Sequence, residues 1–254
     1  MNGRFSAKAI LFDLDGTLLD TITDLADAAN LMLAELGRPA LSQARVHSFV
    51  GRGVNDLIHR CLAESSEPSA AEMDIAREVF RRHYTRVNGQ TTQSYPGVPE
   101  LLAALAARGL KMAVVTNKSA LFTLPLLQQF NLAQYFGAVV CGDTLPVRKP
   151  DPGMVLHACA LLEAKPEESL MIGDSINDSL AARAAGVPVL LVKYGYSEGM
   201  PVENIECDGL LESVGQVADW VEGFHCGDFS VSRRYRGAWK QGMSIDRDEL
   251  HERD

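Results

Sequence analysis

The chain has 254 residues, of which 46% are hydrophobic, and it carries a formal net charge of -9 at pH 7. This length and hydrophobic content suffice for one or two compact units with a sizeable core. The negative charge argues against general binding to nucleic acid or to anionic membranes, because both need a basic surface. We therefore expect neither as a partner, and an anionic substrate would need a local cluster of positive charge.

The sequence also indicates where the protein resides. No stretch is as long and apolar as a membrane span, and the first residues lead directly into a strand rather than a signal-type segment. Its five cysteines are scattered and show no paired metal-type spacing. They are expected to be buried or free thiols in a reducing compartment, which predicts a cytoplasmic protein.

The first apolar run ends in two carboxylates, Asp13 and Asp15, followed by Gly16 and Thr17. If residues 8 to 14 form a strand, both carboxylates emerge on the same side at its carboxyl end. Open parallel sheets bind their ligands at that edge. Two close carboxylates repel each other and invite a divalent cation or a shared proton. The alternative is that Asp13 merely caps the next turn.

Helical spacing follows from residue 21 to residue 88, and no strand is expected again until about residue 110. The first helix closes at Gly37 and Pro39. Further helices are predicted at residues 42 to 48, 54 to 64 and 69 to 88. Since this helical block interrupts an alternation of strands and helices, we interpret it as an insertion that forms a lid.

Beyond Tyr95, strands and helices alternate regularly. This alternation predicts an α/β fold, a Rossmann-like parallel sheet with helices on both faces, plus the inserted all-helical cap. The strands are expected at residues 110 to 115, 138 to 141, 170 to 172 and 188 to 192, and the helices at 98 to 108, 119 to 129, 152 to 162 and 176 to 185.

The end of the chain is less regular. Residues 210 to 224 are predicted to form a last amphipathic helix. The remaining residues, 225 to 254, mix both charges with little periodicity, which is typical of a solvated tail. Phe229, Tyr235 and Trp239 stand among basic residues there, so a docking segment is the alternative.

Polar clusters follow three more of the predicted strands. Thr116 and Asn117 offer a hydroxyl and an amide at a helix start, the parts of an oxyanion or phosphate cradle, although Thr116 alone is more often a helix cap. Lys149 projects from a proline-rich loop and can neutralise an anion. Asp174 and Asp178 lie one helical turn apart. With the first aspartates they would supply the hard oxygen ligands that suit magnesium, whereas no histidine cluster suggests zinc.

These clusters, in this order, closely resemble the signature motifs of the haloacid dehalogenase superfamily of aspartate-nucleophile phosphatases. The resemblance covers residues 8 to about 224. It implies an α/β core of residues 1–17 and 95–225 and a helical cap of residues 18–94, with residues 226–254 outside the family pattern. Residues 142 to 152 and 181 to 196 are similar to bacterial phosphoglycolate phosphatases, which implies 2-phosphoglycolate as the substrate.

The resemblance also implies a role for each polar residue. Asp13 would attack phosphorus and form an aspartyl phosphate. Asp15 would protonate the leaving alkoxide and then activate water, which requires a neutral carboxyl group at the start. Mg²⁺ would be bound by Asp13, the backbone carbonyl of Asp15 and Asp174, with support from Asp178. The phosphate oxygens would be bound by Thr116, Asn117 and Lys149.

The substrate itself should be selected by the cap. Arg52, which lies between two glycines, is the first candidate for binding the glycolate carboxylate, and a solvated arginine is the alternative. Other small phosphomonoesters, a sugar phosphomutase and a non-catalytic binding module remain as alternatives. Asp15 argues against a dehalogenase, and residues 21 to 94 lack the lysine that a phosphonate-cleaving relative needs. We expect a monomer or a homodimer that acts on a small-molecule phosphate ester.

Overall fold

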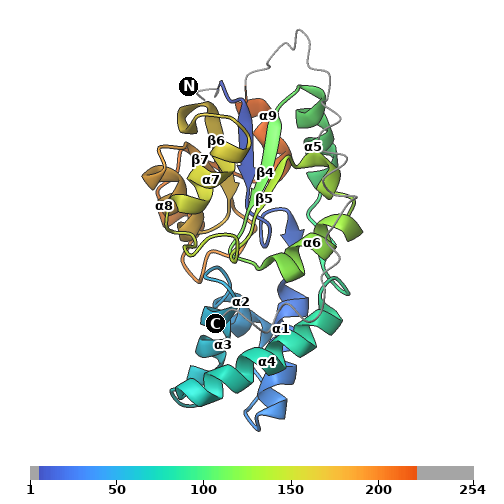
Figure 1. The fold of residues 1–254 in the computed structure, drawn as a ribbon, viewed down its shortest axis with the longest axis vertical. Helices are drawn as coiled ribbons and strands as arrows, with labels where there is room; N and C mark the ends of the chain where they lie inside the picture. Colours follow the sequence, from blue (N-terminus) through green and yellow to red (C-terminus); the bar gives the residue numbers. More distant parts are fainter. Residues whose placement is uncertain (1–5, 222–254) are drawn as a thin grey trace. The chain divides into compact units, whose positions relative to one another are not determined.

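The computed structural model describes residues 6–221 of the protein (Figure 1). Its centre is a parallel sheet in the strand order β5-β4-β1-β6-β7-β8. In chain order these strands are β1 (Ala9–Phe12), β4 (Lys111–Val115), β5 (Ala138–Val140), β6 (Ser169–Gly173), β7 (Val189–Val192) and β8 (Gly209–Leu211).

Alternating side chains of each strand bury themselves on opposite faces of the sheet. Ile10 and Phe12 of β1 join the hydrophobic cluster that includes α5, α6 and α9, whereas Ala9 and Leu11 join the cluster of α7 and α8. Both faces are therefore covered, which confirms the predicted α/β fold (Figure 1). The helices are α5 (Val98–Ala107), α6 (Ala120–Gln129), α7 (Gly153–Leu161), α8 (Ile176–Ala184) and α9 (Val217–Trp220).

The helical block between the first two strands of the sheet has a hydrophobic cluster of its own, which Phe122 and Tyr196 also join. Its helices match the predicted ones closely. They are α1 (Ile22–Glu35), α2 (Gln43–His47), α3 (Val54–Ala63) and α4 (Ala70–Val87).

Two short strands connect this helical block to the sheet. In β2 (Leu19–Asp20) and β3 (Gln93–Ser94), Leu19 pairs with Ser94 and Asp20 pairs with Gln93 in antiparallel register. The expectation of no strand before about residue 110 is therefore wrong. Two-residue strands are too short to show an alternating pattern, and only their pairing across more than 70 intervening residues reveals them.

The predicted last helix, residues 210 to 224, starts too early. Residues 209 to 211 form the edge strand β8, which pairs with β7, and Leu211 is fully buried. Helical backbone begins at Val214, with a 3₁₀-helix over Val214–Gln216 that continues into α9 at Val217–Trp220. Pairing with β7 thus overrides a local apolar spacing that also fits a helix. The tail predicted from residue 225 onward lies outside the described residues.

Within residues 6–221, no helix is long and apolar enough to cross a membrane. The four cysteines in this range are all free thiols, and three of them are buried. Cys226 lies outside the described residues.

A buried carboxylate anchors residues 89 to 92, the segment that leads from the helical block to β3. Asp24 of α1 accepts five hydrogen bonds, from the backbone N–H of Gly89 and from the backbone N–H and the hydroxyl of both Thr91 and Thr92. Burial would raise the pKa of this carboxyl group, but the hydrogen bonds outweigh burial and lower the pKa. Asp24 therefore holds residues 89 to 92 against α1.

We expect Asp24→Asn to lower the free energy of unfolding by about 1–3 kcal/mol, because an amide cannot accept all five hydrogen bonds. The stabilisation that Asp24 provides should also be lost as the pH falls through its lowered folded-state pKa. Urea denaturation at neutral and acidic pH measures both effects. Asp27→Asn, at an exposed position of the same helix, is the matched control, and an equal loss in both variants would refute the anchoring role.

Candidate active site

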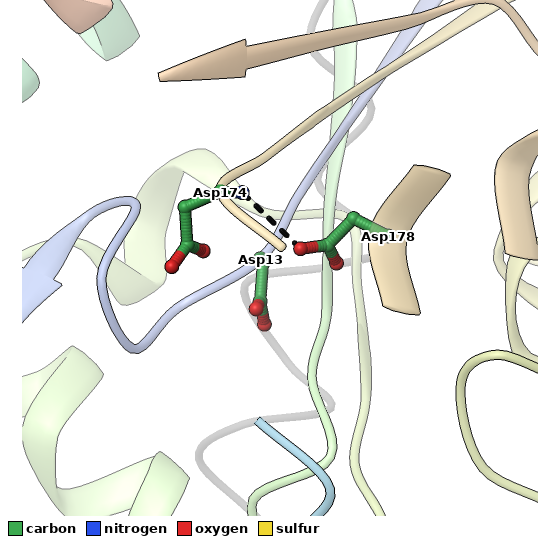
Figure 2. A group of neighbouring side chains, drawn as sticks. All are labelled: Asp13, Asp174 and Asp178. Atoms are coloured by element: carbon green, nitrogen blue, oxygen red, sulfur yellow. Dashed lines mark hydrogen bonds between the residues drawn. The ribbon is translucent and has the colours of Figure 1, made fainter. Parts of the chain in front are cut away.

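The carboxyl ends of β1, β4 and β6 bring the predicted polar residues together. Phe12 pairs with both Val114 and Ile172, so the residues that follow these three strands lie at one edge of the sheet. Three carboxylates meet there: oxygen atoms of Asp13, Asp174 and Asp178 all lie within 4.8 Å of one another (Figure 2).

Hydrogen bonds at the start of α8 hold the carboxylate of Asp178, and residues outside this helix hold that of Asp174. Asp178 Oδ2 accepts hydrogen bonds from the backbone N–H of Asp174 and from both the N–H and the hydroxyl of Ser175, which closes the N-terminal cap of the helix (Figure 2). Asp174 in turn accepts a hydrogen bond from the Thr17 hydroxyl at 2.7 Å. Gly16, with φ of +83°, lets the backbone pass so close to Asp174 that a Cβ atom would lie 2.3 Å from its Oδ2.

Lys149 supplies positive charge to this cluster. Its Nζ lies 3.0 Å from Asp13 Oδ1 and 2.6 Å from Asp178 Oδ1, and the residue is only 3% exposed. Contacts with two carboxylates raise the pKa of Lys149 despite its burial, so the ammonium stays charged. One buried cation thus faces three buried carboxylates, and a negative excess remains.

That excess makes the cluster a suitable site for a metal cation. Burial, partly opposed by the charge of Lys149, raises the pKa of Asp13 to about 7, and burial beside Asp178 raises the pKa of Asp174 well above its usual range. A cation bound between these oxygen atoms would replace the protons that the raised pKa values indicate. The ligand set offers only oxygen, which suits a hard divalent cation and not zinc.

We expect the stability of the metal-free protein to fall between about pH 4 and about pH 7. The folded state keeps a proton on Asp13 up to about pH 7, whereas the unfolded chain loses that proton near pH 3.8, so folding takes up a proton in this range. Melting temperatures with a chelator and with Mg²⁺ measure the effect. Mg²⁺ should raise the melting temperature most at high pH, and Asp13→Asn should flatten the dependence; a pH-independent metal effect would contradict the account.

Asp15 is held by different partners. Its Oδ1 accepts hydrogen bonds from Lys118 Nζ at 2.9 Å and from the Thr21 hydroxyl at 2.7 Å. Lys118 also donates to the Tyr84 hydroxyl of α4 at 2.6 Å. The two aspartates that follow β1 therefore have separate lysines, Lys149 for Asp13 and Lys118 for Asp15.

Thr116 and Asn117 follow β4 at the same edge, as predicted. The Thr116 side chain is buried, and its oxygen accepts a 3.3 Å hydrogen bond from Lys118 N, which leaves its own proton available for an anion. The Asn117 side chain is engaged with backbone groups: its amide nitrogen donates to the carbonyl groups of Gly51 and Lys149, and its oxygen accepts from Lys149 N. Its side chain thus connects the Lys149 loop to the helical block.

A small cavity lies between the carboxylates and the helical block. Its volume is about 50 Å³, room for only a few water molecules when each occupies roughly 10–15 Å³. Polar residues line it from the side of the sheet, and the apolar lining comes from the helical block and from Phe122 of α6. They include Asp13, Asp15, Thr116, Lys118 and Asp174, together with Leu25, Val54, Leu57, Tyr84 and Phe122.

Arg52 does not line this cavity. Its Nε lies 2.9 Å from Glu198 Oε2, and its side chain is 57% exposed, whereas that of Glu198 is 7% exposed. Glu198 also accepts a hydrogen bond from Asn177. All other predicted site residues lie together at the edge of the sheet described above. Arg52 is the exception. Its role in substrate binding stays a prediction.

Comparisons with known proteins identify the family. The sequence matches the family described as haloacid dehalogenase-like hydrolase over residues 10–192. The chain belongs to this hydrolase family. The matched residues contain every predicted site residue, and members of the family that act as phosphatases depend on a metal, which agrees with the buried aspartate cluster.

Individual members of the family are similar over most of their length. The phosphoglycolate phosphatase of Nitrosospira multiformis is 45% identical over 217 residues, which cover 85% of this chain and 96% of the relative. That of Thiobacillus denitrificans is 46% identical over 83% of this chain and 94% of the relative. Among solved structures, a predicted phosphoglycolate phosphatase from Haemophilus somnus superposes with a TM-score of 0.81 at 32% identity, covering 85% of this chain and 99% of that one.

Sequence reasoning missed three residues that complete the site. Lys118 follows Thr116 and Asn117 directly and contacts Asp15, yet its position gave no sign of which carboxylate it would contact. Tyr84 comes from a helix with a long apolar stripe and looks like a core residue. Tyr196 donates its backbone N–H to Asp174, and its hydroxyl accepts from the N–H groups of Thr21 and Ile22. Only tertiary structure reveals these contacts.

Proposed function

We propose that this protein hydrolyses 2-phosphoglycolate to glycolate and phosphate through a phosphoryl group carried on Asp13. The observation that carries the proposal is that the two aspartates line one cavity with different partners: Asp13 lies in the carboxylate cluster beside Lys149, and Asp15 lies beside Lys118. This arrangement suits a nucleophile next to bound phosphate and a proton donor next to the leaving group. The names of the similar relatives support phosphoglycolate as the substrate.

Each residue of the chain has a distinct task in this proposal. Asp13 attacks phosphorus in line with the leaving oxygen, and its carboxylate is oriented by a hydrogen bond from Leu14 N. Lys149 and the hydroxyl of Thr116 hold the phosphate oxygens, and Asn117 fixes the loop of Lys149. Asp15 gives its proton to the glycolate oxygen and then takes one from the attacking water.

Asp13, Asp174 and the backbone carbonyl of Asp15 would hold Mg²⁺. Asp178 would support these ligands, because both of its oxygen atoms are already engaged, one by Lys149 and one by the start of α8. When bound, the cation offsets the repulsion between the attacking carboxylate and the phosphate. The choice of Mg²⁺ rests on the all-oxygen ligand set and on the preference of this ion for phosphate-bearing sites.

We assign residues 18–94 to a cap over a core of residues 1–17 and 95–225. The apolar lining of the cavity comes largely from the cap, and the small cavity suits a compact substrate. We expect the protein to act in the cytoplasm, as a monomer or a homodimer, without nucleic acid or membrane partners. Free cysteines and the net negative charge support these expectations.

The test is a comparison of kcat/KM for a panel of phosphomonoesters with added Mg²⁺, and we expect 2-phosphoglycolate to have the highest value. The Asp13→Asn variant, purified in the same way, shows whether a contaminating phosphatase contributes to the measured activity. If another ester exceeds 2-phosphoglycolate by a wide margin, the substrate assignment fails while the phosphatase assignment stands. Transfer of the phosphoryl group to a sugar phosphate would favour the phosphomutase, and binding without turnover would favour the non-catalytic module.

A further inference from the structure

The distribution of cations around the cavity is uneven. Lys118 is the only lysine or arginine among the described residues that line it. Lys149 is 3% exposed and contacts Asp13 and Asp178, so its charge serves the phosphate side. Arg52 pairs with Glu198 outside the lining. A second anionic group of a substrate therefore has one cation available within the cavity.

Lys118 has donor capacity left for such a group. An ammonium group has three N–H donors, and Lys118 uses one for Asp15 at 2.9 Å and one for the Tyr84 hydroxyl at 2.6 Å. The Tyr84 hydroxyl accepts that bond. Among the described residues, no hydrogen bond is assigned to its own proton. Lys118 is 8% exposed and Tyr84 is 1% exposed, so both groups are held in place. One N–H and one O–H are thus available side by side.

The position of this pair matches the chemistry of the proposed substrate. If Asp15 protonates the ester oxygen, that oxygen lies within hydrogen-bonding distance of Asp15, and Lys118 contacts the same carboxylate. In 2-phosphoglycolate a single carbon separates the ester oxygen from the carboxylate. The lining also includes the apolar side chains of Leu25, Leu57 and Phe122, which cannot stabilise an unpaired charge.

We propose that Lys118, with the hydroxyl of Tyr84, binds the carboxylate of the substrate and thereby selects carboxylate-bearing phosphomonoesters. This inference rests on the proposed function, since it takes Asp13 as the phosphate-binding end of the cavity. It assigns specificity to a residue of the core that meets the cap through Tyr84 of α4. Arg52 then belongs to a contact between the cap loop and Glu198.

The test compares 2-phosphoglycolate with 2-hydroxyethyl phosphate, which is nearly the same size and lacks the carboxylate. The measured quantity is the ratio of their kcat/KM values. We expect the wild type to favour 2-phosphoglycolate and Lys118→Met to reduce that ratio by about 10- to 100-fold, the usual effect of losing a charged hydrogen bond. Because Lys118 also holds Asp15, both substrates should react more slowly, and only the ratio reports on the carboxylate.

Two variants accompany this measurement. Tyr84→Phe removes a single oxygen atom and should lower the same ratio by several fold, which keeps the proposal testable if Lys118→Met does not fold. Arg52→Met is the matched control, because it removes a cation that lies outside the cavity lining but between two lining residues, Gly51 and Gly53, and it should leave the ratio unchanged. A ratio that falls with Arg52→Met but stays at the wild-type value in Lys118→Met and Tyr84→Phe would overturn the proposal and favour Arg52.

Binding gives a readout that is independent of turnover. In the Asp13→Asn background, calorimetry should show that adding Lys118→Met weakens the binding of 2-phosphoglycolate far more than that of 2-hydroxyethyl phosphate. Equal weakening of both would contradict the proposal. If the wild type prefers 2-phosphoglycolate and Lys118→Met keeps the same preference, this inference is refuted and the proposed function stands. A wild-type enzyme that does not hydrolyse 2-phosphoglycolate refutes the proposed function itself.

Discussion

Asp13→Asn should reduce kcat by at least about 10⁴-fold, because loss of a catalytic nucleophile typically removes most of the rate enhancement. An asparagine amide matches the carboxylate in shape but cannot form the phosphorylated carboxylate. Steady-state hydrolysis of 2-phosphoglycolate with saturating Mg²⁺ measures the loss. Asp219→Asn, at an exposed position of α9, is the control and should keep wild-type activity.

The stability of this variant distinguishes loss of chemistry from loss of fold. Asp13 is buried beside Asp178 and Asp174, and burial raises its pKa to about 7. Replacing it with a neutral amide removes part of that unfavourable charge, so the metal-free variant should melt at or above the wild-type temperature at neutral pH. An inactive variant that is also strongly destabilised would leave unfolding as the cause, whereas near-normal hydrolysis would exclude Asp13 as the nucleophile.

Asp15→Asn should lower kcat for 2-phosphoglycolate by about 10²- to 10⁴-fold, the usual contribution of general acid–base catalysis. The glycolate alkoxide is a poor leaving group and needs the proton that Asp15 provides. The leaving group of an aryl phosphate departs without protonation. In Asp15→Asn, such an ester should therefore react with Asp13 nearly as fast as it does in the wild type. Stopped-flow measurement of phenolate release would then show a burst, followed by slow turnover because the water has no base.

The burst also separates Asp15 from a residue that only shapes the site. A variant in which Asp13 is merely misplaced would lose the fast phase together with the slow one. Asp15→Asn should keep the fast phase, because Asp13 stays fixed by Lys149 and Leu14 N, whereas the Asp15 side chain bonds to Lys118 and Thr21. Loss of the fast phase with the aryl ester would therefore contradict the assignment of Asp15 as the proton donor.

Three of the site residues that the sequence could predict each follow a buried strand directly. Asp13, Thr116 and Asp174 come after β1, β4 and β6, and the carboxyl ends of neighbouring parallel strands meet at one edge. Local patterns therefore sufficed to predict where these three lie. Local apolar patterns also predicted the four helices of the helical block and every strand of the described parallel sheet except β8.

The contacts that the sequence could not predict join segments that are distant along the chain. Tyr84 lies 34 residues before Lys118, and Glu198 lies 146 residues after Arg52. The apolar spacing around Tyr84 is typical of any core residue, and a lysine beside Thr116 and Asn117 could have faced solvent. Packing of the helical block against Phe122 and Tyr196 determines these partners, just as pairing with β7 determines β8.

The central claim, a phosphoryl group carried on Asp13, is tested most directly by trapping it. Asp15→Asn protein is mixed with an aryl phosphate and Mg²⁺, quenched in acid within the burst, digested and analysed by mass spectrometry. We predict one added phosphoryl group on the peptide that contains Asp13, which hydroxylamine removes, and none in the Asp13→Asn/Asp15→Asn protein. Product formation in the burst without this adduct, or an adduct on another residue, would contradict the mechanism.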